Sequence, residues 1–452
     1  MKKNLCLILL ACSLLLTVCG CDGGAGAESS PSPSPAESAS EALPQREQDW
    51  LEDIEFLRKI CKTKHMDPFY ICSEEEFDWK LDQLSAKVGE LSDDDISFEI
   101  VSIVAGLGDV HSYAGARQPY DRRFPIRVSY FDNKLYLTAC LKSFEQFEPY
   151  LLHEIVAVNG VDMAYLTEKA NLLGNPFNTR LSQECFKDRY FLPAFFDWAG
   201  CDYKEGYTFQ ILNDNQEVES VDIPVISNDK YQKSSWIYSK DRDALRYLKG
   251  GNSAEYIDGE NGGCVYMLLT ELMDKYSVKR LVQKAGELLD EHPNCGRLVI
   301  DLRNTPGGNA KYVESFHENS QLLDAEAIYV LTSGTTASAA LTYISYFKGE
   351  LDAVVVGEPT GQFPSMFHLQ TSLDKPYELP HSRILVMLSN AWWDSAEDMP
   401  EFGVLPVYEE YYDENGRLYP WESTILPDVY VYQDIEDIRQ GKDSVIEWVL
   451  AQ

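Results

Sequence analysis

Positively charged residues are scarce in this chain. Its 452 residues include 39 Lys and Arg against 73 Asp and Glu, which gives a formal net charge of −34 at pH 7. Because so many carboxylates repel phosphate groups, the composition argues against a nucleic-acid partner and against charge-driven docking on anionic lipid. The other proportions, 44% hydrophobic and 25% charged residues, are those of a globular protein. Domains usually hold about 100–200 residues, so the length predicts two to four of them.

An apolar run long enough to span a bilayer comfortably is also missing from the N-terminus. The run Leu5–Leu16 follows Lys2 and Lys3, and it is shorter than the roughly 20 residues of a membrane helix. It leads to Gly20-Cys21, which resembles a bacterial lipobox. The resemblance implies a lipoprotein signal peptide over residues 1–20, lipidation of Cys21, and a chain held on the extracytoplasmic face of the membrane. A retained membrane anchor or plain secretion are the alternatives.

Paired cysteine motifs are absent as well. Seven cysteines remain between Cys61 and Cys295 once the signal and Cys21 are set aside, an odd number with no CxxC spacing. We therefore expect neither a disulfide framework nor a zinc site, and most of these thiols should be buried. A single disulfide is the alternative. The histidines other than His111 lack ligand spacing, so we expect no metal and no other cofactor.

The chain changes character along its length. Residues 21–46 are rich in Ser, Pro and Gly and read as a flexible, lipidated tether. Residues 47–118 have apolar positions at helical spacing and predict a helical N-terminal domain. Residues 119–230 contain hairpin patterns and predict a β-rich middle domain. In residues 255–452 strands alternate with helices, which predicts an α/β layered core. The core strands are expected at Gly263–Leu269, Arg297–Leu302, Ala327–Thr332, Ala353–Gly357 and Arg383–Leu388.

One segment has the features of a serine nucleophile. An apolar strand, Tyr329–Thr332, runs into a small turn, and a helix begins near Ala337 with Ser338 in its first turn. A hydroxyl there lies beside free backbone N–H groups and the positive end of the helix dipole, as acyl transfer to serine requires. Taken alone, the stretch also fits an ordinary N-cap.

Two further turns could serve the same chemistry. Asp301–Asn309 follows a buried strand, and Gly307 and Gly308 would let backbone amides approach a substrate closely. His111 follows a glycine-rich helix stop and is a plausible general base near pH 7. An ordinary turn and a structural histidine are the alternatives.

These segments, in this order, resemble the tail-specific or C-terminal processing serine peptidases, a family that includes the tricorn core protease and the retinoid-binding protein modules. The matching stretches are Asp109–Ser112, Asp301–Gly308, Thr336–Leu341, Gly357–Gly361 and Ile425–Val429. The resemblance implies a crotonase-like catalytic core and a PDZ-like element around Ile155–Val161. It also implies that Ser338 is the nucleophile, with an oxyanion hole from the amides of Ala339 and of Gly307 or Gly308.

The chain departs from the family in its base and at one acidic position. The processing branch places a Lys shortly after Gly-Glu-Pro-Thr, where this chain has Gly361-Gln362-Phe363-Pro364, and Leu341 replaces an acid. The tricorn-like branch uses a His from the N-terminal region, so the resemblance favours a Ser338–His111 pair. Glu422 is the candidate for the orienting acid, with Glu358 and Asp428 as rivals.

The sequence therefore supports three hypotheses about function. The first is a membrane-tethered serine-type endopeptidase or processing peptidase that acts on peptides or proteins through an acyl-enzyme. The second is a catalytically inactive relative that binds peptides or another ligand, because a fold alone does not decide activity. An unrelated structural lipoprotein is the third reading. The sequence gives neither the natural substrate nor the oligomeric state.

Overall fold

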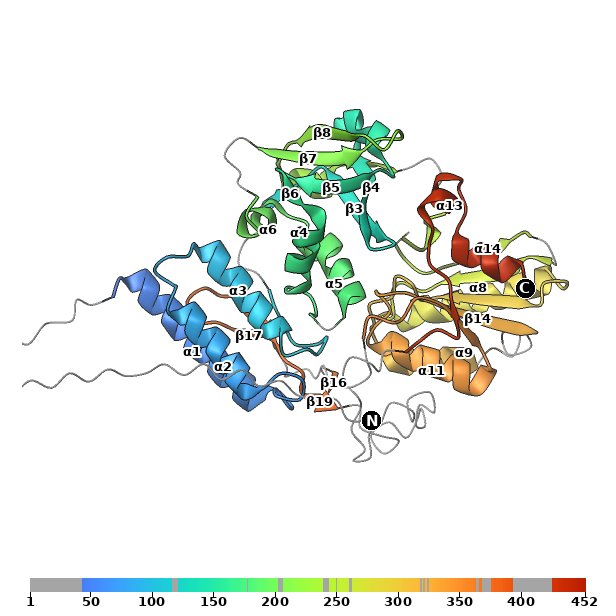
Figure 1. The fold of residues 1–452 in the computed structure, drawn as a ribbon. Helices are drawn as coiled ribbons and strands as arrows, with labels where there is room; N and C mark the ends of the chain where they lie inside the picture. The colour runs from blue at the N-terminus through green and yellow to red at the C-terminus, as the bar shows by residue number, and fades with distance from the viewer. Residues whose placement is uncertain are drawn as a thin grey trace, which may run out of the picture. The chain divides into compact units, whose positions relative to one another are not determined.

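The N-terminal part of the chain is mainly helical. The computed structural model describes residues 43–115, 121–176, 178–201, 206–238, 244–248, 250–259, 262–317, 319, 322, 325–362, 366–367, 375–392 and 425–452. Its first helices are α1 (Gln45–Lys64), α2 (Glu74–Ser85) and α3 (Asp93–Ala105) (Figure 1). Ser73 and Ser92 cap α2 and α3 by accepting the backbone N–H three residues ahead. The helical expectation for this region is confirmed.

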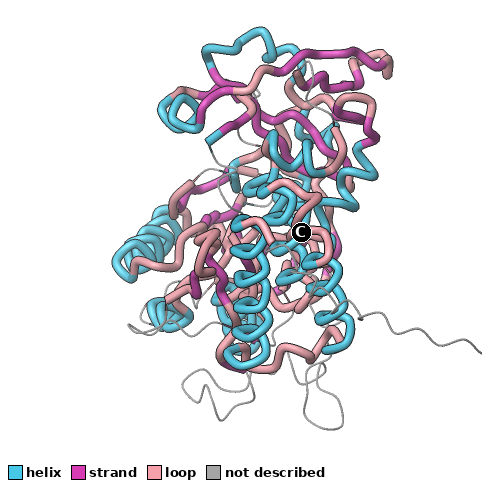
Figure 2. Tube along the Cα trace, turned by 90° about the vertical axis from the view of Figure 1, so that its left-hand side faces the viewer, coloured by secondary structure: helices cyan, strands magenta, loops and turns pink. Residues whose placement is uncertain are grey.

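The middle of the chain forms a seven-stranded sheet, whose strands are the magenta segments at the top of Figure 2. The strands are β3 (Ile126–Phe131), β4 (Lys134–Leu141), β5 (Glu154–Val158), β6 (Val161–Asp162), β7 (Tyr207–Leu212), β8 (Val218–Ile223) and β10 (Trp236–Tyr238). The β3–β4 hairpin turns at Asp132 and Asn133, whose φ angles of 48° and 60° fit a two-residue hairpin turn. Helices α4 (Met163–Asn171), α5 (Thr179–Cys185) and α6 (Pro193–Trp198) lie between β6 and β7 in sequence.

The C-terminal part is built on a six-stranded sheet in the order β11-β12-β13-β14-β15-β20. Its strands are β11 (Ser253–Ile257), β12 (Cys264–Leu268), β13 (Arg297–Asp301), β14 (Ala327–Thr332), β15 (Val354–Gly357) and β20 (Val429–Tyr430), and all neighbours except β11 and β12 are parallel. One face packs against α8 (Lys275–Glu291) and α11 (Ala339–Leu351), and the other against α14 (Ser444–Leu450) (Figure 1). This confirms layered α/β structure in the core region.

One expected strand belongs to a different sheet. The stretch Arg383–Leu388 contains β18 (Leu385–Met387), which pairs with β17 (Tyr377–Glu378) and with β1 (Tyr113–Ala114), so its placement in the core sheet was wrong. Its apolar residues pack into the hydrophobic core of α1–α3. A short continuous apolar run such as Ile384–Leu388 predicts a strand but does not identify the strand it pairs with, which packing decides. The outer strands β11 and β20 were not predicted, and β20 has only two residues.

Shorter elements complete the described structure. They include the strand pairs β2 (Arg122–Arg123) with β9 (Ile226–Ser227) and β16 (Met366–Phe367) with β19 (Ala391–Trp392), and the helices α7 (Asn228–Lys233), α9 (Glu314–His317) and α13 (Ile435–Arg439). There are also 3-10 helices, η2 (Lys142–Tyr150), η4 (Arg246–Leu248) and η6 (Ala310–Val313), and a π-helix, η3 (Phe186–Tyr190). Pro44–Gln452 is one compact unit by its contacts. None of the helices in the described ranges has the length and apolarity needed to cross a bilayer.

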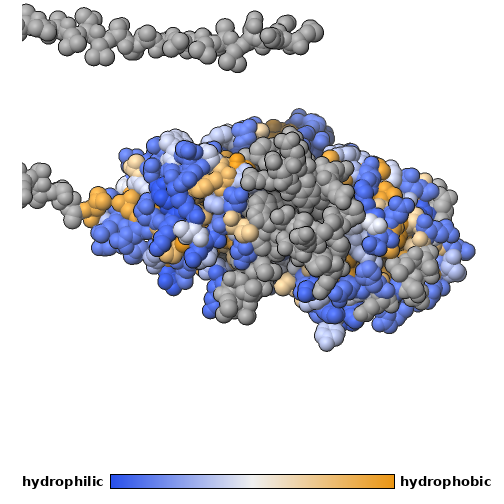
Figure 3. All heavy atoms as spheres, turned by 90° about the horizontal axis from the view of Figure 1, so that it is seen from below, coloured by the Kyte–Doolittle hydropathy of each residue, from blue (hydrophilic) through white to orange (hydrophobic). Residues whose placement is uncertain are grey.

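The surface and the cysteines agree with the composition. On the face drawn in Figure 3, hydrophilic residues cover most of the described atoms. The cysteines from Cys61 to Cys295 are all free, and all but the half-buried Cys185 are buried. The expectation that most of these thiols lie in the core is confirmed.

Candidate active site

Ser338 stands between the end of β14 and the start of α11, in a backbone conformation that non-glycine residues avoid. Its φ and ψ are 56° and −128°, and holding such a conformation costs on the order of 1–3 kcal/mol. It occupies the N-cap position of α11, but its side chain makes no capping hydrogen bond. The hydroxyl therefore does not perform the role that an ordinary N-cap would give it. A strained serine at a strand-to-helix turn is the arrangement that exposes a nucleophile.

The glycine turn after β13 lies against this serine. A Cβ on Gly307 would stand 2.5 Å from Cβ and 3.0 Å from Oγ of Ser338, and Gly307 has a φ of 121°. Only glycine fits a site with both constraints. Ala339 is the first residue of α11, and its N–H has no hydrogen-bond acceptor among the described residues. The structure thus brings Ser338, Gly307 and Ala339 together, while Gly308 packs on Leu272.

A residue without a predicted role holds the backbone of the serine. The N–H of Ser338 donates a 2.7 Å hydrogen bond to Oε1 of Gln362, which is 3% exposed. The backbone oxygen of Gln362 accepts from Oγ1 of Thr360 at 3.0 Å. Gln362 belongs to the stretch in which the sequence lacks the lysine of the processing branch. Sequence reasoning noted only that absence, because nothing in the pattern tells which backbone group an amide side chain will reach.

The serine turn is fastened to the glycine turn. Ala337 donates its N–H to the carbonyl oxygen of Thr305 at 3.1 Å. Oγ of Ser333 donates to the carbonyl oxygen of Arg303 at 2.6 Å, and Oγ1 of Thr336 to that of Leu302 at 2.8 Å. These bonds join the loop after β14 to the loop after β13, so the two loops form one rigid unit.

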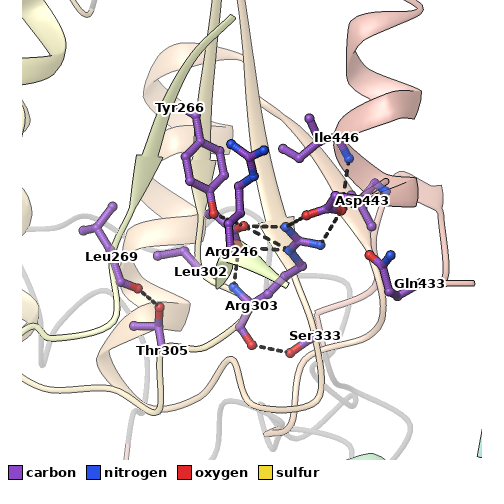
Figure 4. Close-up of polar contacts among 12 residues, drawn as sticks. Arg246, Tyr266, Leu269, Leu302, Arg303, Thr305, Ser333, Gln433, Asp443 and Ile446 are labelled. Atoms are coloured by element: carbon purple, nitrogen blue, oxygen red, sulfur yellow. Dashed lines mark hydrogen bonds and ion pairs between the residues drawn. The ribbon is translucent and has the colours of Figure 1, made fainter. Parts of the chain in front are cut away.

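Arg303 anchors that unit to the start of α14 (Figure 4). Its guanidinium donates to the carboxylates of Asp301 and Asp443, at 2.6 and 2.7 Å respectively from Nη2, and it stacks on the ring of Tyr247. Tyr266 donates its hydroxyl to Asp301 at 2.7 Å. Burial lowers the pKa of Arg303, but the two carboxylates outweigh it and raise that pKa well above its usual value. The Asp-Leu-Arg part of the motif is therefore structural: it ties the glycine turn to the C-terminal helix α14.

The predicted base, His111, lies on a loop organised by Asp109. The backbone N–H groups of His111 and Ser112 donate to Oδ1 of Asp109 at 3.0 and 2.8 Å. Oδ2 of Asp109 is 2.8 Å from Nε2 of His65. An aspartate two residues before His111 is a signal that sequence reasoning could have used, since aspartate commonly bonds the backbone two residues on.

One segment of the chain contacts both loops. Nδ2 of Asn175 donates to the carbonyl oxygen of Gly108 at 2.7 Å, next to Asp109. Nε of Arg180, on α5, donates to Glu358 at 2.8 Å, and a Cβ on Gly334 would stand 2.7 Å from Cβ of Arg180. The segment before and within α5 therefore adjoins both the His111 loop and the turn that carries Ser338. The pairing of Ser338 with His111 stays a prediction.

The candidate orienting acids differ in their contacts. Glu422, like Cys21, lies outside the described residues. Glu358 is bound to Arg180. Asp428 pairs with Lys348 at 2.6 Å and accepts the N–H of Val355 at 2.9 Å. These contacts place Asp428 at the amino end of β15, whereas Ser338 follows the carboxyl end of the parallel strand β14, so Asp428 does not fit the orienting role.

Within the described ranges, no group of three or more His, Cys, Asp or Glu could hold a metal ion. No protein-family model matches the chain, and no curated protein matches its sequence.

Solved structures, by contrast, do match. Mature CPAF complexed with lactacystin covers 90% of this chain and 98% of its own at a TM-score of 0.58 and 12% identity. A second structure of mature CPAF gives a TM-score of 0.56 at 13% identity, with 90% and 96% covered. A photosystem II D1 C-terminal processing protease also matches, at a TM-score of 0.41 and 11% identity, over 91% and 98%.

The structural neighbours belong to the tail-specific, or S41, peptidase family. The family resemblance predicted from the motifs is confirmed, and the two CPAF structures carry the assignment of the fold. At 12–13% identity the likeness shows that this chain has the fold of CPAF.

Proposed function

We propose that this protein is a serine-type peptidase that hydrolyses peptide bonds of peptides or proteins through an acyl-enzyme. The observation that carries the proposal is the strained conformation of Ser338, whose side chain does not cap α11 and which lies against Gly307. A structural serine would gain nothing from this strain, whereas a nucleophile gains exposure.

The proposed steps use groups of this chain alone. Oγ of Ser338 attacks the peptide carbonyl carbon while His111 accepts its proton. The oxyanion receives hydrogen bonds from the N–H of Ala339 and from that of Gly307 or Gly308. The tetrahedral intermediate collapses, and His111 gives the proton to the leaving amine. Water then attacks the acyl-enzyme with His111 again as base. The ester bond to Oγ of Ser338 breaks, Oγ receives the proton from His111, and the carboxylic acid product leaves. Glu422 is the proposed orienting acid for the imidazole.

The proposal extends to location and substrate binding. Lipidated Cys21 would hold the protein on the extracytoplasmic face of the membrane. The core would be crotonase-like, and the antiparallel sheet of the middle region PDZ-like. That sheet ends in the outer strand β8, and an exposed strand edge can accept an extended peptide. Fractionation tests the anchor: replacing Cys21 with Ala should move the protein out of the membrane fraction.

A fluorophosphonate probe tests the chemistry. The probe phosphonylates an activated serine, and this reaction mimics the acylation step of the proposed mechanism. Full-length protein should be labelled, whereas Ser338→Ala and His111→Ala should not. If only Ser338→Ala loses the label, His111 is not the base. If folded wild-type protein is not labelled, the inactive peptide- or ligand-binding function is favoured instead. Sequencing the products of a cleaved peptide library would separate an endopeptidase from an enzyme that trims C-termini.

A further inference from the structure

The carboxylate of Asp109 is buried, and both of its oxygens accept hydrogen bonds. Its side chain is 1% exposed. Oδ1 accepts the N–H groups of His111 and Ser112 and the hydroxyl of Ser389, and Oδ2 accepts from His65. Burial would raise the pKa of Asp109, but the hydrogen bonds from His65, Ser389 and Ser112 lower it to about 2. A buried, charged group with four donors is a rigid centre for the chain around it.

A backbone N–H two residues further along the chain determines which ring nitrogen of His65 carries the proton. The N–H of Asp67 donates to Nδ1 of His65 at 3.1 Å, so Nδ1 carries no proton. Nε2 is then the protonated nitrogen, and it donates to Asp109 over 2.8 Å. Because His65 is the C-cap of α1, the helix end determines where the donor stands.

The cluster joins three distant parts of the sequence. His65 follows α1, Asp109 follows α3, and Ser389 follows β18. The N–H of Met66 donates to the carbonyl oxygen of Ser389 at 2.9 Å, and the N–H of Ser389 donates to Oγ of Ser112 at 3.0 Å. The pairing of β1 with β18 begins one residue beyond Ser112. The backbone of the His111 loop is thus held from both sides.

We infer that Asp109, held by His65 and Ser389, positions His111 for the proposed reaction by fixing the backbone that carries its imidazole. Asp109 contacts the N–H of His111, and its oxygens are occupied by other donors. It is therefore a positioning residue, distinct from the acid that would orient the ring. The inference rests on the proposed function, in which His111 is the base.

The test changes which of the side chains at positions 65 and 109 donates a hydrogen bond and which accepts it. In Asp109→Asn, the new amide N–H meets either Nε2–H of His65 or the two backbone N–H groups, so two donors face each other. His65→Gln keeps a donor for Asp109. In the double variant, the glutamine oxygen can accept from the asparagine amide, which restores the match. Each full-length variant is treated with the fluorophosphonate probe, and kinact, KI and Tm are measured.

We expect kinact to fall about tenfold in Asp109→Asn with KI unchanged, equivalent to about 1.4 kcal/mol of barrier. The double variant should recover at least half of that loss on a logarithmic scale, and His65→Gln should stay within about threefold of wild type. The matched control is Asp53→Asn. Asp53 is also buried and accepts the N–H groups of His381 and Ser382, before β18, but it does not contact the His111 loop. Its substitution should lower Tm and leave kinact unchanged.

The outcomes separate the two claims. If wild-type labelling depends on Ser338 and His111 but Asp109→Asn keeps the wild-type kinact, the positioning role is wrong and the peptidase proposal stands. If kinact falls equally in Asp53→Asn, or the double variant shows no recovery, Asp109 is merely structural and the inference is also wrong. Labelling that does not need His111 overturns both. Should Asp109→Asn not fold, Ser389→Ala replaces it, since it removes one donor and keeps the carboxylate; an unchanged kinact there contradicts the inference.

Discussion

The backbone N–H of Ser338 donates to the side-chain oxygen Oε1 of Gln362 at 2.7 Å. This bond connects the loop after β14 with the loop after β15, and it holds the residue whose φ is 56°. A side chain that follows Gly-Glu-Pro-Thr-Gly thus supports the conformation of the proposed nucleophile. This stretch contains no lysine. Its Gln362 instead holds the shape of the turn that carries Ser338.

Replacing Gln362 with Leu should weaken both stability and labelling. The partly buried N–H of Ser338 would lose its acceptor, which costs about 1 kcal/mol. We expect a lower Tm and a kinact about tenfold smaller, since Ser338 can then leave its strained conformation. Gln362→Glu is the control, because it has nearly the same shape and keeps an accepting oxygen. Labelling of the Leu variant at the wild-type rate would contradict this role.

Gly307→Ala should abolish labelling. The added Cβ would stand 2.5 Å from Cβ of Ser338, in addition to the strain of a φ of 121°. Gly160 provides the matched control, since its φ is 79° and a Cβ there meets nothing within 4 Å. Gly160→Ala should therefore cost about 1 kcal/mol of backbone strain and leave kinact unchanged. If both variants lost the same stability, the loop of Gly307 could move away from Ser338 without cost, which would contradict the close contact between them.

Ser338→Gly should be inactive yet more stable than Ser338→Ala. Both lose Oγ, but glycine adopts the observed φ without strain, and the gain should be about 1 kcal/mol after the entropy of the unfolded chain is counted. Chemical denaturation measures the difference. Ser345, inside α11, is the control: there Gly should be less stable than Ala by about 1 kcal/mol. The same order at both positions would argue against strain at Ser338.

The stabilisation by Asp109 should disappear in acid. Its pKa in the folded protein is lowered from 3.8 to about 2, so the charged form favours folding at pH values above about 4. As the pH falls from about 4 to about 2, the stability gap between wild type and Asp109→Asn should shrink by roughly 2 kcal/mol. Denaturation by urea at several pH values measures this gap. A gap that stays constant over the same range would contradict the lowered pKa.

Local pattern was sufficient for much of the fold. The caps Ser73 and Ser92, the β3–β4 turn at Asp132 and Asn133, and the parallel strands from β12 to β15 all follow from interactions within a few residues or from periodicity. The same holds for the turn that carries Ser338, because a strand, a small-residue loop and a helix leave a distinct local signature.

Contacts between distant residues could not be predicted in this way. The β18 segment was assigned to the wrong sheet, since a continuous apolar run suits a buried strand in any sheet. The bonds of Gln362 to Ser338, and of His65 and Ser389 to Asp109, join residues separated by 24 to 280 positions. No short-range pattern encodes such a pair.

The sequence by itself determined the class of fold, the position of the turn that carries Ser338 and the family resemblance, because these depend on short motifs and their order. Only the tertiary structure decided that Ser338 is strained and does not cap its helix, that Gly307 lies against it, and that Asp109 is the centre of the His111 loop. The physical reason is that hydrogen-bond partners and backbone strain depend on which surfaces the packed core brings together.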